Sequence, residues 1–312
     1  MRRYKTAVLG YYGFGNLGDE LLLSACLEMF RRCGVSREEV VVLTNSPDDE
    51  PSVNRWRYGE VARALRQSEA LLLGGGGLFQ DSTSIKSCVW YWGIVRLARM
   101  MGCKVWAVGQ SVGPLRSTMG RMFAGNALRA CEAVHVRDEA SLRLAESLGC
   151  RNVVLGSDLV MTLAAGAGGR AGATAAATLV NLRPCEGLER FTRIIAPHLE
   201  GKVVGVALSD EDIPALSALG LSEIVRVWSL DEAAALWAGA SRTIGMRLHF
   251  GVLSRIFRTP LALMPYDPKV SEFASQSGVP CITDTWHEPV MPLPVPECSA
   301  KIDALCREVL TL

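Results

Sequence analysis

Arg247, His249 and Lys269 have the residue types and spacing to do chemistry on an anion. They lie in TIGMRLHFGVLSRIFRTPLALMPYDPK, residues 243–269, which predicts a strand, a helix, a second strand and the start of another helix. Residues 250–257 suit a helix packed on a sheet, and the LALMP run that follows is as apolar as a buried parallel strand. The three side chains are therefore expected at one sheet edge, where open α/β folds bind ligands.

The same residues also have an ordinary structural interpretation. Arg247 could cap the helix or form a local ion pair, and His249 could be a helix-start histidine with satisfied hydrogen bonds. The rest of the chain has to decide between the two interpretations.

Composition indicates an ordered protein of two domains. The chain has 312 residues, of which 49% are hydrophobic and 21% charged, and each half is long enough to bury its own core. The net charge is only +1, from 33 Lys and Arg against 32 Asp and Glu, so no overall field favours nucleic acid. An anion site must therefore be local.

The sequence also predicts a cytoplasmic protein without a structural metal. The first ten residues, MRRYKTAVLG, have no secretory signal pattern, and no stretch has the length and apolarity of a membrane span. The ten cysteines are scattered singly without C-x-x-C spacing, which favours reduced thiols over disulfides or a zinc site. No metal-ligand cluster stands out, and no particular oligomeric state is predicted.

Alternating strands and helices predict two Rossmann-like domains. The first covers residues 1–163 and the second residues 175–312, with a small, polar linker at residues 164–174 between them. Two such halves facing each other across a cleft describe a GT-B-like α/β architecture. The last helix, near residues 299–310, is expected to pack back on the N-terminal domain.

The expected strands follow from short apolar runs. In the N-terminal domain they cover residues 6–9, 40–43, 70–73, 104–108, 133–136 and 153–155. In the C-terminal domain they cover residues 177–182, 203–208, 224–227, 242–245 and 261–264.

Two glycine-rich turns and one charged pair are further candidates in the N-terminal domain. In GYYGFGNLGDE, Asn16 and Asp19 can cap the following helix or face a ligand. The residues Gly74 to Gly77 follow the third strand directly, and they predict either a tight crossover to a helix or backbone amides crowded against a polar ligand. Arg137 lies beside Asp138 at a strand end. It is either a cationic ligand residue, or the two residues form a simple ion pair or helix cap.

In order and spacing, seven segments of the chain resemble the polysaccharide pyruvyltransferase family, most closely its bacterial cell-wall branch. They are GYYGFGNLGDE, LLLGGGGLF, VGQSVGPL, HVRDEAS, VNLRP, GMRLHF and YDPKV. The segments span most of the chain, and RLH followed by the YDPK lysine is the most discriminating feature. The middle of the second domain is shorter than the family pattern.

This resemblance implies transfer of the enolpyruvyl group of phosphoenolpyruvate to a sugar as a cyclic ketal, with release of phosphate. In the cell-wall branch the acceptor is N-acetylmannosamine in a lipid-linked precursor, which would bring the enzyme to the inner membrane face as a peripheral protein. Phosphoenolpyruvate is a co-substrate, and no cofactor is implied. Partners would be this donor and the sugar acceptor.

The resemblance also assigns roles to residues. His249 would be the general acid that protonates the methylene carbon. The donor would be held by Arg137, Arg247, Lys269 and Arg183 of VNLRP, and by the helix start at Leu248. The acceptor side would comprise Asn16, Asp19, Gly75, Gly76, Gly77 and Asp158, with Asp19 or Asp158 assisting deprotonation of the sugar.

Two alternatives compete with this hypothesis. A nucleotide-sugar-dependent GT-B glycosyltransferase would share the two domains and the glycine turns. A non-catalytic carbohydrate-binding protein would bind without turnover, but it gives the three cationic positions no joint purpose.

Overall fold

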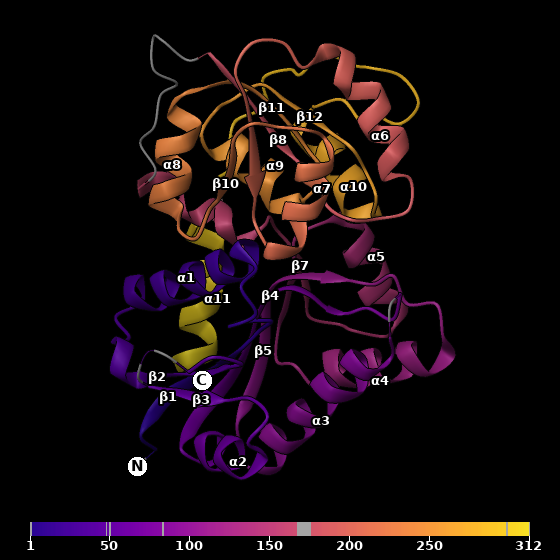
Figure 1. Cartoon of the computed structure of the whole chain (residues 1–312). Coiled ribbons are helices and arrows are strands. Elements are labelled where there is room, and N and C mark those ends of the chain that lie inside the picture. Colours follow the sequence, from indigo (N-terminus) through magenta and orange to yellow (C-terminus); the bar gives the residue numbers. More distant parts are fainter. Residues whose placement is uncertain are drawn as a thin grey trace. The chain divides into compact units, whose positions relative to one another are not determined.

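The computed structural model describes residues 2–47, 49, 51–82, 84–166, 176–297 and 299–311 (Figure 1). The chain forms two compact units. The first unit comprises Met1–Phe14, Leu22–Thr162 and Glu297–Leu312, and the second comprises Gly15–Leu21 and Leu163–Pro296. Most of the expected linker, from residue 167 onward, lies outside the described residues.

The first unit is built on a parallel sheet of seven strands in the order β3-β2-β1-β4-β5-β6-β7. The strands are β1 (Tyr4–Leu9), β2 (Val40–Thr44), β3 (Ser52–Asn54), β4 (Ser68–Phe79), β5 (Lys104–Val112), β6 (Val134–Val136) and β7 (Val153–Leu155). Apolar residues of β1, β2, β4 and β5 are buried, as expected where helices cover both faces of a sheet. The short edge strand β3 has no apolar run, and the sequence did not predict it.

The helices of the first unit pack against this sheet. They are α1 (Leu17–Arg32), whose first turn belongs to the second unit, α2 (Tyr58–Arg66), α3 (Lys86–Met100), α4 (Thr118–Arg129), α5 (Glu139–Ser147) and α11 (Ser299–Thr311), with short 3-10 segments η1 (Arg37–Glu39) and η2 (Leu159–Gly166). The C-terminal helix α11 is fixed in this unit by an ion pair of 2.8 Å between Arg32 and the buried Asp303.

The glycine run corrects one prediction, because it continues strand β4 instead of turning into a helix. Gly74 and Gly76 keep parallel register with β5, so backbone pairing holds the segment extended. Gly75 has a φ of +70°, and a Cβ there would lie 2.6 Å from Leu22 Cδ2. The glycine at this position therefore allows close packing of α1 on the strand.

His135 on β6 makes the stability of the first unit depend on pH. Burial lowers the pKa of this histidine from its ordinary value of 6.5 to about 4, and its Nδ1 accepts the Gly109 N–H at 3.1 Å. Because the folded state keeps the ring neutral, this contribution is complete above pH 6.5 and is lost as the pH falls towards 4. Between pH 7.5 and 4.5, urea unfolding should show the wild type losing about 2.5 kcal/mol more than His135→Gln. Equal losses in the two proteins would contradict this.

The second unit holds a parallel sheet of five strands in the order β10-β9-β8-β11-β12. Its strands are β8 (Ala177–Asn181), β9 (Val203–Ala207), β10 (Ile224–Arg226), β11 (Ala240–Gly245) and β12 (Leu261–Leu263). Its helical segments are α6 (Leu188–Ile195), η3 (Ala196–His198), η4 (Asp210–Asp212), α7 (Ile213–Ala218), α8 (Leu230–Ala238), α9 (Leu248–Ile256) and α10 (Pro268–Ser277). All five strands predicted for this half are present.

Three general features bear on the function. The described part of the chain holds no helix that is long and apolar enough to cross a membrane. Nor do the described residues gather three or more His, Cys, Asp or Glu side chains that could hold a metal ion. The nine described cysteines are free thiols.

Candidate functional site

The carboxyl ends of four neighbouring strands bring the candidate residues of the second unit together. Because β9, β8, β11 and β12 are parallel, the loops that follow them meet at one sheet edge. Asn181 ends β8. The loops contain Arg183 after β8, Ser209 to Asp212 after β9, Arg247 after β11, and Tyr266 and Asp267 after β12. The sheet therefore places Arg247, His249 and Lys269 at the same edge, as expected, and Arg183 lies at that edge too.

Arg247 is held in place by a carboxylate that the sequence did not single out. Its Nε lies 2.7 and 2.8 Å from the two oxygens of Asp212, and its Nη2 lies 2.7 Å from Oδ1. Asn181 fixes the backbone, because its Oδ1 accepts the Arg247 N–H at 2.9 Å. One edge of the guanidinium is thus occupied by protein, and Arg247 is the N-cap residue of α9.

Asp212 is itself fully buried and anchored by the backbone. The amides of Leu208 and Ser209 donate to its Oδ2 at 3.0 and 3.3 Å, and Asn181 Nδ2 donates at 3.3 Å. Burial opposes the charge on Arg247, but the hydrogen bonds and charge of Asp212 outweigh it and raise the pKa of Arg247. The arginine is therefore a fixed cation.

His249 is the second residue of α9, at the helix end where backbone amides favour anions. It is half-buried, and its Nε2 atom is shielded from solvent. The first turn of α1 packs on the ring, since a Cβ added to Gly18 would lie 2.1 Å from His249 Nδ1. This turn belongs to the second unit, where the Leu17 N–H donates to the Leu208 carbonyl at 2.9 Å.

Asn16 and Asp19 flank the glycine that touches His249. Asn16 Nδ2 donates to the Asp19 carboxylate, and the Asn16 carbonyl accepts the Asp19 N–H at 3.0 Å. Both residues thus help to start α1, which agrees with the capping interpretation. Their loop associates with the second unit, whereas the expected boundary assigned it to the N-terminal domain.

Arg183 and Lys269 differ in how far their charges are neutralised. Arg183 donates from Nη1 to the Tyr266 hydroxyl at 2.9 Å, and its guanidinium lies 4.6 Å from the centre of that ring. Its buried Nε has no hydrogen-bond partner among the described residues. Lys269 Nζ lies 3.5 Å from Asp267, which also caps α10. Arg183 thus has no described carboxylate partner within 4.0 Å, whereas Lys269 does.

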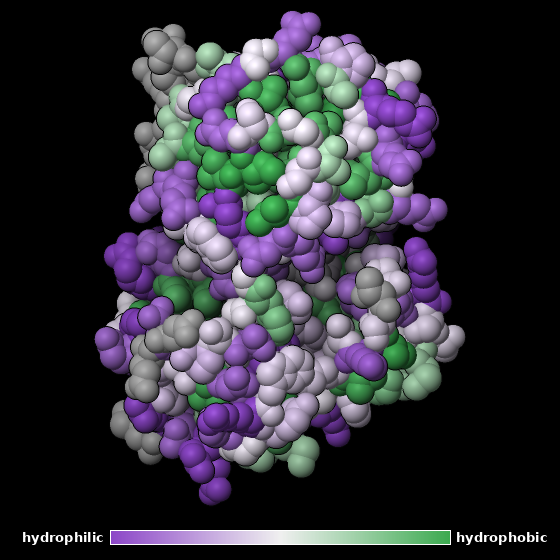
Figure 2. Space-filling model, viewed as in Figure 1, coloured by the Kyte–Doolittle hydropathy of each residue, from purple (hydrophilic) through white to green (hydrophobic). Residues whose placement is uncertain are grey.

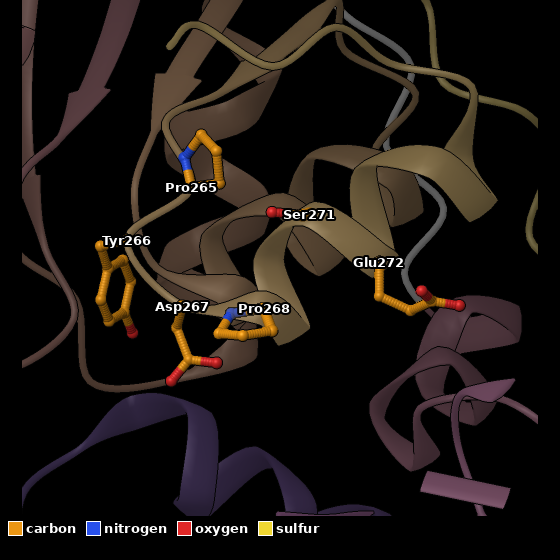
Figure 3. Close-up of a pocket in the computed structure, with 6 residues that line it drawn as sticks. All are labelled: Pro265, Tyr266, Asp267, Pro268, Ser271 and Glu272. Atoms are coloured by element: carbon orange, nitrogen blue, oxygen red, sulfur yellow. The ribbon is translucent and has the colours of Figure 1, made fainter. Parts of the chain in front are cut away.

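A pocket of about 540 Å³ lies beside this edge (Figure 3). Pro265, Tyr266 and Asp267 line it from the loop after β12, and Pro268, Ser271 and Glu272 line it from α10. Two carboxylates, a serine hydroxyl and an aromatic ring suit the hydroxyl groups of a neutral sugar better than an anion. The pocket is therefore not where the donor anion is expected.

Arg137 and Asp158 of the first unit bind each other. Arg137 Nη1 donates to Asp158 Oδ2 at 2.8 Å, and both side chains are buried. Asp158 Oδ1 also accepts the Val160 N–H at 3.0 Å, and the neighbouring Asp138 caps α5 through Ser141. The ion pair considered from the sequence, between Arg137 and Asp138, is long at 3.9 Å, and Asp158 is the closer partner. A role for Arg137 in donor binding stays a prediction.

The glycines expected on the acceptor side differ in exposure. Gly75 and Gly76 are buried within β4, and a Cβ at Gly75 would meet Leu22. Gly77 is exposed, and a Cβ there would meet nothing within 4 Å. Only Gly77 therefore offers its backbone to solvent.

Sequence reasoning missed Asp212, Asn181 and Tyr266 as partners of the expected cations. A signal existed, because Asn181 lies at the end of one apolar strand and the SDED segment follows another, and both strands end at the same sheet edge. SDED resembles a solvated helix start, however, and only the structure distinguishes the buried Asp212 from the exposed Asp210 and Glu211.

Comparison with solved structures shows the fold. The chain is similar to a UDP-GlcNAc 2-epimerase from Methanocaldococcus jannaschii in complex with UDP-GlcNAc and UDP (TM-score 0.61, 11% identity, covering 98% of this chain and 99% of that one). It is also similar to the UDP-GlcNAc 2-epimerase of Neisseria meningitidis (TM-score 0.53, 8% identity, 98% and 91%). A functionally uncharacterised protein of Klebsiella pneumoniae is another match (TM-score 0.50, 14% identity, 88% and 88%). These likenesses confirm a GT-B fold of two Rossmann-like halves.

Sequence comparison identifies the family. A search of curated proteins gives no match to this chain. The model of the polysaccharide pyruvyl transferase family matches residues 16–268, which include the RLH segment and extend almost to the YDPK lysine. Because this match covers most of the chain, the protein is a transferase that belongs to the polysaccharide pyruvyl transferase family.

Proposed function

We propose that this chain transfers the enolpyruvyl group of phosphoenolpyruvate to a sugar as a cyclic ketal, with release of phosphate. The observation that supports this donor most directly is the gathering of Arg183, Arg247, His249 and Lys269 at one sheet edge of the second unit. Phosphoenolpyruvate carries a carboxylate and a phosphate on three carbons, so its binding needs several converging donors. The first turn of α9 adds backbone amides.

The ion pairs at this edge indicate how the cations would share the donor. Asp212 takes the Nε side of Arg247, which leaves Nη1 for the ligand. No described carboxylate counters the positive charge of Arg183, because Tyr266 contributes only a hydroxyl and a ring. Lys269 Nζ lies 3.5 Å from the half-buried Asp267 and can exchange that partner for an anion. Arg183 and Arg247 are therefore the proposed main anchors.

The proposed reaction begins when His249 protonates the methylene carbon, C3, of phosphoenolpyruvate. The positive charge that develops at C2 is attacked by one sugar hydroxyl, which forms the first carbon–oxygen bond. The C2–O bond to phosphate then breaks, and a second hydroxyl forms the second bond of the ketal. One hydroxyl proton restores His249 and the other is released, so atoms and charge balance.

For the acceptor we propose N-acetylmannosamine in a lipid-linked cell-wall precursor. This choice follows the resemblance to the cell-wall branch, and it would place the protein at the cytoplasmic membrane face as a peripheral partner. Within the second unit, Asn16 and Asp19 lie beside Gly18, which contacts His249, so a sugar held there would meet the acid. Asp19 is the proposed base for a sugar hydroxyl.

A turnover assay tests this proposal. The protein is incubated with phosphoenolpyruvate and a short-chain lipid diphosphate carrying an N-acetylmannosamine disaccharide, and phosphate and product mass are followed. We expect one phosphate released per pyruvate ketal formed. If UDP-GlcNAc replaces phosphoenolpyruvate, we expect no product. Sugar transfer from UDP-GlcNAc without reaction of phosphoenolpyruvate would instead identify a glycosyltransferase, and binding without turnover would identify a carbohydrate-binding protein.

A further inference from the structure

A second cationic site lies in the first unit, at the amino ends of its strands. A pocket of about 480 Å³ is lined by Arg2, Arg3, Arg63, Arg66 and Gln67. Arg2 and Arg3 immediately precede β1, and Arg63 and Arg66 lie one turn apart at the end of α2. Arg137 follows the carboxyl end of β6 in the same parallel sheet. The arginine pocket lies at the amino ends of the strands, so it is on the opposite side of the sheet from Arg137 along the strand direction.

The arginine pocket has both a fixed and an adjustable part. Arg2 donates to the Ser68 carbonyl, and to the Met101 carbonyl at 2.9 Å, which ties it to the starts of the strands. Arg3, Arg63 and Arg66 are exposed and can turn towards a ligand. On the face shown in Figure 2, the region over the N-terminal strand and α2 is mainly hydrophilic.

The charges of these four arginines are not neutralised by the described residues. Nearby Glu60 binds Arg57 at 3.1 Å, and Glu69 binds Lys5 at 3.1 Å. Among the residues with described placement, no carboxylate lies within 4.0 Å of a guanidinium nitrogen of Arg2, Arg3, Arg63 or Arg66. Glu60 does line a smaller adjoining pocket of about 200 Å³. Because like charges repel, four guanidiniums around one pocket favour a bound anion.

We propose that this arginine pocket binds clustered phosphate groups, two or more at a time. A guanidinium group can donate two parallel hydrogen bonds to the oxygens of a phosphate. Four guanidinium groups offer more such donors than one phosphate ion can accept. The pocket volume also accommodates more than one phosphate group. A soluble diphosphate and a row of phospholipid headgroups share this chemistry, and the pocket serves either without taking part in the transfer reaction.

The first experiment measures diphosphate binding by calorimetry. Sodium pyrophosphate is titrated into the wild type, into Arg63→Gln/Arg66→Gln, and into the control Arg31→Gln/Arg143→Gln. The control changes the net charge equally, but its arginines are exposed in the first unit and paired with Glu28 and Glu139. We expect the pocket variant to lose one pyrophosphate site, or to bind it at least tenfold more weakly, while the control matches the wild type. Pyrophosphate held at the sheet edge of the second unit remains in all three proteins.

A second experiment distinguishes the source of the phosphates. The three proteins are co-sedimented with vesicles of phosphatidylcholine, alone or mixed with phosphatidylglycerol. If the wild type and the control sediment with anionic vesicles and the pocket variant does not, the ligand is a group of lipid headgroups. A lost pyrophosphate site without vesicle retention identifies a soluble diphosphate. The proposal is overturned if the pocket variant and the control behave alike in both experiments, because general electrostatic attraction would then explain all binding.

Discussion

His249→Asn is expected to lower the kcat of pyruvyl transfer by about 10²- to 10⁴-fold, which is the usual contribution of a positioned general acid. Asparagine keeps a polar group of similar size at the start of α9 but cannot deliver a proton to carbon. Because Arg183 and Arg247 are the proposed anchors of the donor, the Kd for phosphoenolpyruvate should change only a few-fold. Rapid-quench turnover and equilibrium binding measure the two effects separately.

His287→Asn is the matched control for this substitution. His287 belongs to the same unit but is exposed, and its ring contacts the nearby Thr285 hydroxyl. We expect it to keep wild-type kcat and the same thermal midpoint. If His249→Asn retained more than a tenth of the wild-type kcat, proton donation by His249 would be wrong.

Gly18→Ala tests the position of the imidazole without changing its chemistry. A Cβ at Gly18 would lie 2.1 Å from His249 Nδ1 and 2.6 Å from Cγ, so the ring or the first turn of α1 must move. We expect kcat to fall by at least tenfold while phosphoenolpyruvate still binds. Gly59→Ala is a suitable control, because it lies in the first turn of α2 and a Cβ there meets nothing within 4 Å.

Much of the architecture could be predicted from the sequence because buried parallel strands leave a strong local signal. Runs such as VVVL in β2 and LAL at β12 are continuously apolar, and a polar turn comes after each strand. The order of these turns predicted Arg247, His249 and Lys269 at one sheet edge, and the structure has them there. The part of strand β4 beyond Leu73 was not predicted. Its continuation depends on pairing with β5, and glycines, which lack side chains, give no hydrophobic pattern.

The charge partners could not be predicted, since they depend on contacts between distant segments. Arg247 and Asp212 are 35 positions apart, and the choice among Asp210, Glu211 and Asp212 is made by the turn after β9. Likewise, nothing local in GNLGDE indicates that its second glycine, Gly18, packs on His249 of the second unit. The residue types therefore identified which side chains have suitable chemistry, and the fold decides which of them are already paired with other protein groups.

Asp212→Asn is expected to destabilise the second unit by about 3–5 kcal/mol, the usual cost of leaving one member of a buried ion pair without its partner. Asp212 is fully buried and receives two backbone amides, so water cannot replace the lost charge readily. Arg247 would keep its own charge, which burial disfavours, and would lose the contacts that fix its orientation. Urea unfolding of the full chain measures the loss of stability.

The same substitution also separates orientation of Arg247 from simple structural support. As a positioning residue, Asp212 should matter for donor binding, so under conditions where Asp212→Asn is folded we expect the KM for phosphoenolpyruvate to rise at least tenfold, with a smaller change in kcat. Glu211→Gln is the matched control, because Glu211 is exposed and its carboxylate lies 3.6 Å from Arg247 Nη2. An ion pair with such an exposed carboxylate is expected to contribute little. Equal KM values for the two variants would show that Asp212 supports the fold without orienting Arg247. In Asp212→Ala, which leaves space for a small carboxylate beside the guanidinium, added formate should partly restore donor binding and chloride should not.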